Sequence, residues 1–210
     1  MATSTRIARA THPRLAEGDV RVRVGAVGIS ALGTQVAGTI DAVGPDSVGF
    51  ARNDRVAFRS TAPAGSTTVV VAERDLIGIP SDVSLDAAAA IFPCALLART
   101  IVKQVHSIGR RNSVSITDIS VVAPFAAAWV EHLGATVSSG NADVVVSGQS
   151  VRSALGVRSG HGLVQQAAAD VFAAMRAGAF DSIALSSPDE ARNGSRAPVL
   201  LHPAEVTLAA

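Results

Sequence analysis

The sequence has few of the residues on which many kinds of site depend. Its 210 residues include no tyrosine, a single cysteine and an aromatic content of only 3%. One cysteine excludes an internal disulfide bond and a metal cage built from cysteines. The five histidines are scattered without the spacing of metal ligands, so we expect no metal site. The net charge of +1 argues against a nucleic-acid-binding surface.

Long hydrophobic runs are also missing. No apolar stretch approaches the ~20 residues of a membrane span, and residues 1–14 lack the apolar segment of a secretory signal. We therefore expect a cytoplasmic protein that has no membrane partner. Hydrophobic residues nevertheless make up 48% of the chain, and the mean hydropathy is +0.36. A chain of this length and composition can form one large domain or two small ones with a substantial core.

Short strands separated by turns are predicted over the first 80 residues. Residues 19–27 alternate strictly, with Val20, Val22 and Val24 on one face, which is typical of a half-buried strand. Turns rich in glycine, proline, asparagine and aspartate follow at regular spacing. This pattern favours a small β-barrel or sandwich. The further strands are predicted at 36–43, 56–59 and 67–71, and residues 76–79 close this part of the chain.

Beyond Pro80 the pattern changes to alternating helices and strands. Ser84 is a typical helix N-cap, and Pro124 and Gly134 suit the first turn and the end of a later helix. A strand, helix, strand unit around that helix has the shape that holds a dinucleotide in many enzymes. The predicted elements are helix 85–105 interrupted at Pro93, strand 113–116, helix 124–133, strand 135–137, a buried parallel strand at 143–147, a helix ending at Gly178 and strand 199–201.

The turn of that unit, residues 117–123, is unsuited to a phosphate. A phosphate-binding turn needs glycines so that backbone N–H groups can approach the pyrophosphate. This turn has no glycine, two β-branched valines and the carboxylate of Asp118. Asp118 also lies at the carboxyl end of a strand, where α/β sheets place ligands. We interpret it either as a general acid/base or anchor for a cationic group, or as a cap for the following helix.

Six stretches carry a resemblance to a known family. They are GDVRVRVGAVGIS (18–30), LGTQVAGTIDAVGPDSVGFARNDRVAF (32–58), IGIPSDVSLDAAAAIF (77–92), NSVSI (112–116), HLGATV (132–137) and ADVVVSG (142–148). In this order they resemble the medium-chain dehydrogenase/reductase superfamily, above all the enoyl reductase domains of polyketide synthases and the quinone oxidoreductases. The resemblance implies an α/β fold (α+β overall). Residues 1–80 with 180–210 would form a GroES-like β-barrel domain, and residues 81–179 a truncated Rossmann-like α/β layer.

The departures from the family pattern fall on its cofactor and proton-transfer parts. In the enoyl reductases a longer loop at this place offers a tyrosine, whereas here only Ser30 and Ala31 stand in its place. The family's Gly-Ser-Glu becomes Gly33-Thr34-Gln35. Residues 138–141 have no cation where the family often has a lysine for the cofactor phosphate. At least one helix and one strand are missing between Val137 and Asp143. The resemblance thus implies the fold without a cofactor.

The candidate site residues follow from this reading. The candidate catalytic residues are Asp118, Gln35 and Thr34; the candidate substrate-binding residues are Ser30, Arg59, Cys94, Arg99 and Trp129. Alternatives stay open for several of them. Thr34 and Gln35 either hydrogen-bond a substrate carbonyl or satisfy backbone groups. Cys94 is otherwise a small buried hydrophobe, and Arg99 lies either in the cleft or on a helix surface.

The function hypothesis is a cofactor-independent enzyme of polyketide-type biosynthesis. Its apolar cleft would fold a small hydrophobic polyketide-like substrate for cyclisation, cycloaddition or isomerisation, reactions that need no hydride and few catalytic side chains. One alternative is a non-catalytic binding or scaffolding protein. Another is an NADPH-dependent enoyl or quinone reductase with an atypical cofactor site. The resemblance also makes a homodimer possible.

Overall fold

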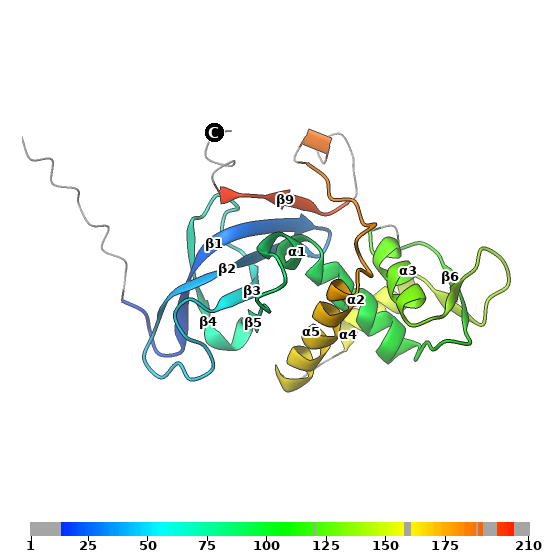
Figure 1. Ribbon diagram of the computed structural model, residues 1–210, viewed down its shortest axis with the longest axis horizontal. Coiled ribbons are helices and arrows are strands. Elements are labelled where there is room, and N and C mark those ends of the chain that lie inside the picture. The colour runs from blue at the N-terminus through cyan, green and yellow to red at the C-terminus, as the bar shows by residue number, and fades with distance from the viewer. Residues whose placement is uncertain (1–13, 120, 158–160, 188, 191–196, 204–210) are drawn as a thin grey trace, which may run out of the picture.

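The structure is a computed structural model that describes residues 14–119, 121–157, 161–187, 189–190 and 197–203. A large antiparallel sheet and a small parallel sheet lie on either side of a central group of helices (Figure 1). The strands are β1 (Asp19–Ser30), β2 (Gly33–Val43), β3 (Arg55–Ser60), β4 (Thr68–Ala72), β5 (Ile77–Gly78), β6 (Ser113–Ile116), β7 (Thr136–Val137), β8 (Val144–Val146) and β9 (Val199–Leu201). The helices are η1 (Glu73–Asp75), α1 (Leu85–Ala90), α2 (Phe92–Thr100), η2 (Ile101–Val105), α3 (Ala123–His132), α4 (Gly148–Gly156) and α5 (His161–Arg176).

The long strand β1 organises the large sheet. The strand order is β4-β1-β2-β3-β5, and β9 also pairs with β1. Residues 19–23 of β1 pair with β4 and residues 27–29 pair with β9, so two strands share one edge of β1. The register against β2 shifts after Arg21 and after Val24, and such bulges bend a strand. The chain's last described strand therefore returns to its first sheet (Figure 1).

The predicted alternation of β1 is confirmed. Val20 and Val22 are fully buried and Val24 is 8% exposed. They pack with residues such as Ile40 and Phe58 into a core on one face of the large sheet. Burying apolar side chains on one face while polar ones point outward is what stabilises a strand of period two.

A tight hairpin joins β1 to β2. Ser30 pairs with Gly33, so only Ala31 and Leu32 form the loop. Gly33 has a φ of +102°, a conformation that favours glycine. The short bridge predicted from the sequence is thus a two-residue turn, and no longer loop enters the space beside it.

Two short helices, α1 and α2, replace the single interrupted helix predicted at 85–105, and a π-helical turn, η2, follows them. Ser84 is the N-cap as expected, because its Oγ accepts a hydrogen bond from Ala87 N–H at 3.0 Å. Helix α1 packs closely on β1: a Cβ added to Gly28 would lie 2.0 Å from the Ala89 carbonyl oxygen. Only glycine permits this approach of strand and helix.

The small sheet is parallel and has the order β7-β6-β8. The parallel strand predicted at 143–147 is present, but its expected burial is wrong for Val145, which is 53% exposed. The reason is that Val145 points to the opposite face of the strand from Val144 and Val146, which are more buried. Helix α3 ends before Gly134, which has a φ of +75°, as the sequence predicts.

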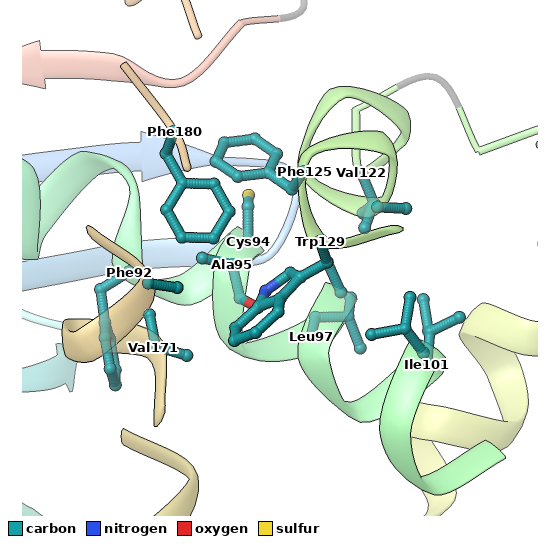
Figure 2. Close-up of a cluster of buried hydrophobic side chains, with 14 of the residues drawn as sticks. Phe92, Cys94, Ala95, Leu97, Ile101, Val122, Phe125, Trp129, Val171 and Phe180 are labelled. Atoms are coloured by element: carbon teal, nitrogen blue, oxygen red, sulfur yellow. The ribbon is translucent and has the colours of Figure 1, made fainter. Parts of the chain in front are cut away.

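The main core joins the two sheets through the helices. Phe92 stacks on Phe172 at 5.0 Å between ring centroids, and Trp129 meets Phe180 edge-on at 5.8 Å. Figure 2 shows Cys94 beside the rings of Phe125 and Phe180 in this cluster. The predicted fold class, a barrel-type antiparallel sheet with a shortened Rossmann-like layer, is confirmed; the domain boundaries stay a prediction. None of the helices in the described part of the chain is both long and apolar enough to span a membrane.

Candidate functional site

Two adjoining cavities open between the large sheet and the helices. The inner cavity has a volume of about 350 Å³ and is bounded by β2, β3, α2 and the end of α4; the outer cavity, of about 620 Å³, reaches α5. They share Arg59, Asp75 and Ile77, so they are continuous. The walls of the inner cavity are mainly apolar, with Leu32, Phe58, Ile77, Phe92, Leu96 and Leu155 among them. A volume of this size is within the range of small-molecule sites.

Gln35 is the most buried polar residue of the inner cavity. It is 9% exposed and its side chain lines the cavity wall. Among the described residues its amide has no hydrogen-bond partner. The buried side-chain atoms without a partner in the described chain are Ser47 Oγ and Arg99 Nη1, so the amide atoms of Gln35 are not sealed in the core. The amide is therefore available to a ligand in the inner cavity.

A row of polar side chains crosses the sheet at this point. Gln35 of β2 pairs directly with Arg59 of β3, which places their Cβ atoms about 5 Å apart on one face. On the other side of β3, Ala57 pairs with Ile77. Asp75, at the end of η1 and two residues before Ile77, lines the same cavities as Arg59. We call Gln35, Arg59 and Asp75 the polar row; all three line the inner cavity.

Each member of the polar row is held differently. The Arg59 Nη2 donates to the Leu32 carbonyl of the tight hairpin, which leaves its other N–H groups for a ligand. Asp75 is exposed, and its carboxylate makes no hydrogen bond or ion pair to any described residue. Thr100 adds a hydroxyl that donates to Leu96 O at 3.0 Å and can still accept. Sequence reasoning missed Asp75 and Thr100, because neither belongs to a recognisable motif.

Thr34 and Ser30 on the large sheet and Cys94 on α2 do not line the cavities. Thr34 precedes Gln35 on β2 and so points to the opposite face. Ser30 Oγ accepts from Leu32 N–H at 3.1 Å within the hairpin. Cys94 is fully buried, and burial raises the pKa of its thiol to about 11, with a hydrogen bond from Ser30 offsetting only part of the shift. The alternative of a small buried hydrophobe describes Cys94 better than substrate contact.

Asp118 is not brought together with Gln35. Its carbonyl oxygen lies near Gly148 at the start of α4, whereas Ala154 and Leu155 at the far end of α4 line the inner cavity. At 1.5 Å per residue these ends are about 10 Å apart. The capping alternative is wrong as well, because the N-cap of α3 is Val122 without a side-chain cap. The φ of Asp118 is +56°, so this residue helps to form the turn between β6 and α3.

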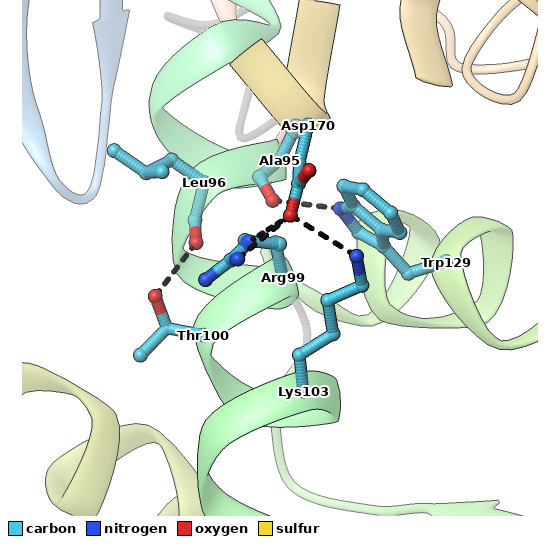
Figure 3. A network of polar contacts seen from close by, with 7 residues as sticks. All are labelled: Ala95, Leu96, Arg99, Thr100, Lys103, Trp129 and Asp170. Atoms are coloured by element: carbon cyan, nitrogen blue, oxygen red, sulfur yellow. Dashed lines mark hydrogen bonds and ion pairs between the residues drawn. The ribbon is translucent and has the colours of Figure 1, made fainter. Parts of the chain in front are cut away.

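Arg99 and Trp129 belong to the core (Figure 3). Arg99 Nε and Nη2 both donate to Asp170 Oδ2, at 3.0 and 2.7 Å. Trp129 is 1% exposed and its Nε1 donates to Ala95 O at 2.8 Å. Neither lines the inner or the outer cavity, so this arrangement does not support their predicted contact with a substrate. Both positions are explained by packing between α2, α3 and α5.

The turn between β6 and α3 does not fit a dinucleotide. Val122 N–H and Ala123 N–H both donate to the Ile119 carbonyl, each at 2.8 Å, and Pro124 has no N–H. These are the groups that would meet a pyrophosphate at a helix N-terminus. The exposed carboxylate of Asp118 beside them would repel an anion. Among the described residues there is also no group of three possible metal ligands.

The start of α4, which leads into the inner cavity wall, is held by three side chains. Ser150 Oγ accepts from Ser147 N–H at 3.1 Å and lies 2.7 Å from His106 Nε2. The Ser150 hydroxyl can donate to Nε2 of a neutral imidazole or accept from a protonated Nε2. Burial lowers the pKa of His106, which favours the neutral imidazole.

We expect acidification to weaken this contact. Since the folded-state pKa of His106 lies below the unfolded value, its contribution to stability is present above about pH 6.5 and is lost as the pH falls through the folded-state pKa. Thermal unfolding at pH 7.5 and 5.0 should show a larger acid loss in wild type than in His106→Gln. The difference should be below about 1 kcal/mol. Equal losses in both proteins would contradict the assignment.

Comparison with known proteins agrees with this architecture. No protein-family model matches the chain. The quinone oxidoreductase of Pseudomonas aeruginosa is 32% identical over 117 residues, which cover 52% of this chain and 36% of that protein. The chain therefore spans little more than a third of the length of this curated relative.

Solved structures extend the similarity over most of the chain. A mycobacterial quinone oxidoreductase has a TM-score of 0.71 at 17% identity, covering 91% of this chain and 93% of that chain. The ER cyclopropanase CurF from the curacin A biosynthetic pathway has a TM-score of 0.54 at 21% identity, covering 70% and 52%. At these identities the likeness concerns the fold. The chain is thus similar in sequence to a quinone oxidoreductase over about half of its length, and it shares the fold of the medium-chain dehydrogenases/reductases over most of it.

Proposed function

We propose that the chain is a cofactor-independent enzyme that binds a small apolar, carbonyl-bearing, polyketide-like substrate in the inner cavity and rearranges it. The observation that carries this proposal is an open cavity whose deepest polar group, the Gln35 amide, has no partner among the described residues. A cavity filled by its own side chains would have argued for a scaffold. The similarity to CurF supports the polyketide setting.

The size and polarity of the inner cavity define the substrate class. At about 30 Å³ per atom in the liquid state, 350 Å³ holds roughly a dozen non-hydrogen atoms. Apolar walls favour an aliphatic or unsaturated chain by removing it from water. The Gln35 amide and the Arg59 guanidinium can both donate to one carbonyl oxygen, because they are cross-strand neighbours.

Such a site can accelerate a rearrangement without a hydride. It would hold the substrate in a reactive conformation and stabilise negative charge that develops on the carbonyl oxygen. Cyclisation and isomerisation both gain from these effects. The turn before α3, whose N–H groups are used within the turn, supports a reaction that does not need a dinucleotide.

The test is binding of an aliphatic enone, 3-decen-2-one, measured by titration calorimetry. Gln35→Met should weaken binding about tenfold, because it removes a hydrogen bond to the carbonyl. The same change should leave thermal stability unchanged or raised, since the Gln35 amide makes no hydrogen bond within the described chain and methionine is more apolar. Thr34→Val, at the next position on the same strand but on its other face, is the matched control and should bind like wild type.

Two results would contradict the proposal. If the enone does not bind, or binds equally to Gln35→Met, the inner cavity is not a carbonyl site. Micromolar binding of NADPH in the same calorimeter would favour the reductase alternative. Tight enone binding without any conversion of the substrate class would leave the binding-protein alternative.

A further inference from the structure

One member of the polar row, Asp75, has a carboxylate without a stabilising contact in the described chain. Asp75 ends the 3-10 turn η1 and directly precedes the fully buried Leu76. It lines both the inner and the outer cavity, and its side chain makes no hydrogen bond or ion pair within the described part of the chain. Its place in the lining of the inner cavity with Gln35 and Arg59 is therefore not explained by a contact within the described chain.

The backbone around Asp75 is fixed on both sides. The carboxylate of Glu73 accepts hydrogen bonds from Gly49 N–H at 2.6 Å and Phe50 N–H at 3.0 Å. On the other side, the Leu76 carbonyl accepts from Gln165 Nε2 of α5 at 3.0 Å. The two acidic residues of this short turn therefore have different roles. Glu73 anchors the turn to the neighbouring loop, whereas Asp75 lines the cavities.

We propose that Asp75 is the general base of the site and that the reaction is the isomerisation of a β,γ-unsaturated carbonyl compound to its conjugated α,β-unsaturated isomer. This inference rests on the proposed function of the inner cavity and specifies its substrate class and chemistry. A base must reach the carbon next to the carbonyl group while the oxyanion donors reach the carbonyl oxygen. The inner cavity offers both kinds of group, because Gln35, Arg59 and Asp75 all line it.

The proton and electron balance needs no oxidant, reductant or cofactor. The Asp75 carboxylate removes a proton from the carbon next to the carbonyl group, and the C–H electron pair moves to give a dienolate. The negative charge collects on the carbonyl oxygen, where the Gln35 amide and the Arg59 guanidinium donate hydrogen bonds. The Asp75 carboxylic acid then returns the proton to the γ carbon. The double bond has moved by one position and Asp75 is again a carboxylate.

The experiment uses the whole chain and 4-decen-2-one, a β,γ-unsaturated ketone of suitable size. Its conversion to the conjugated isomer is followed by ultraviolet absorbance, and deuterium uptake from D2O by NMR. Wild type should catalyse both. Asp75→Asn should lower both rates by about a hundredfold or more while its calorimetric affinity for 3-decen-2-one stays within about twofold of wild type, because the carboxylate contributes to proton transfer rather than to carbonyl binding.

Asp46→Asn is the matched control. Asp46 is an exposed aspartate with a φ of +59°, far from the polar row in sequence and outside both cavity linings; asparagine tolerates this conformation. It should isomerise the ketone at the wild-type rate, and thermal unfolding should confirm that both variants are folded.

Two outcomes separate this inference from the proposed function. If wild type binds the enone but neither isomerises the unsaturated ketone nor exchanges its protons, Asp75 is not a base for this class and the inference is overturned, while the binding site stands. Undiminished exchange in Asp75→Asn overturns it equally. If the enone does not bind at all, both proposals fall together.

Discussion

Trp129→Ala is expected to lower the free energy of unfolding by about 3–5 kcal/mol, the usual loss for removing a large buried aromatic side chain. The indole is 1% exposed, meets Phe180 edge-on at 5.8 Å and lies under Lys103 Nζ at 5.6 Å. Alanine would leave a cavity where α2, α3 and the segment after α5 meet (Figure 2). It would also remove the hydrogen bond to the Ala95 carbonyl.

Trp129→Phe separates these two effects. Phenylalanine keeps most of the packing and loses the Nε1–H donor, so the Ala95 carbonyl is left without that partner and the expected loss is about 1–3 kcal/mol. Urea unfolding should be followed by far-UV circular dichroism, because Trp129 is the only tryptophan and its removal abolishes the intrinsic indole signal. Val48→Ala, at a side chain that is 94% exposed, should not change stability.

The same variants test the role that the sequence suggested for Trp129. If the residue belongs to the core alone, Trp129→Phe should bind 3-decen-2-one with wild-type affinity once it is folded. A variant with unchanged stability and lost affinity would instead return Trp129 to the list of substrate contacts. The structure predicts the first result, because Trp129 does not line the inner cavity.

Local signals in the sequence predicted the structural features that are determined by residues close together in the chain. The alternating valines of β1, the Ser84 cap and the stop at Gly134 are each decided within a few positions of the chain. The absence of glycine between Thr117 and Ala123 is a local signal of the same kind, and in the structure two N–H groups of this turn donate to the Ile119 carbonyl.

Contacts between residues that are distant in the sequence could not be predicted from such local signals. Arg99 was equally compatible with a cleft and with a surface, because Asp170 lies 71 positions away. Asp75 had no motif, and its place in the polar row follows only from the cavity that the folded chain forms. Gln35 was identified through the family resemblance, but its missing hydrogen-bond partner could be seen only in the folded chain. The register between strands, rather than composition, builds the candidate site.

The contact between Arg99 and Asp170 also joins α2 to α5, and α2 forms a wall of the inner cavity. Lys103 Nζ makes a third contact to Asp170 Oδ2 at 3.0 Å. Burial raises the pKa of the Asp170 carboxyl, but the hydrogen bonds and charges of Arg99 and Lys103 outweigh that effect, so its pKa lies below the ordinary value. The charges of Arg99 and Lys103 are thus both balanced by the Asp170 carboxylate, and the Arg99 side chain is only 11% exposed.

Asp170→Ala is therefore expected to cost about 2–4 kcal/mol of unfolding free energy at pH 7, because it leaves the Arg99 charge buried and unpaired. The value is below that of a fully buried pair, since the Asp170 side chain is 33% exposed. A double variant, Arg99→Leu with Asp170→Leu, should recover much of the loss, because it removes the charge together with its partner. Failure of the double variant to recover would mean that packing, not the unpaired charge, causes the loss.

The pH dependence of the same variant gives an independent check. Because the folded-state pKa of Asp170 is lowered, the stability it contributes is fully present above the unfolded-state value of about 4 and disappears as the pH falls through the folded-state pKa. Urea unfolding at pH 7, 5 and 3 should therefore show a constant gap between wild type and Asp170→Ala at the two higher values and a smaller gap at the lowest. A gap independent of pH would mean that the ionised carboxylate does not hold α2 and α5 together. The inner cavity would then owe its shape to the aromatic core alone.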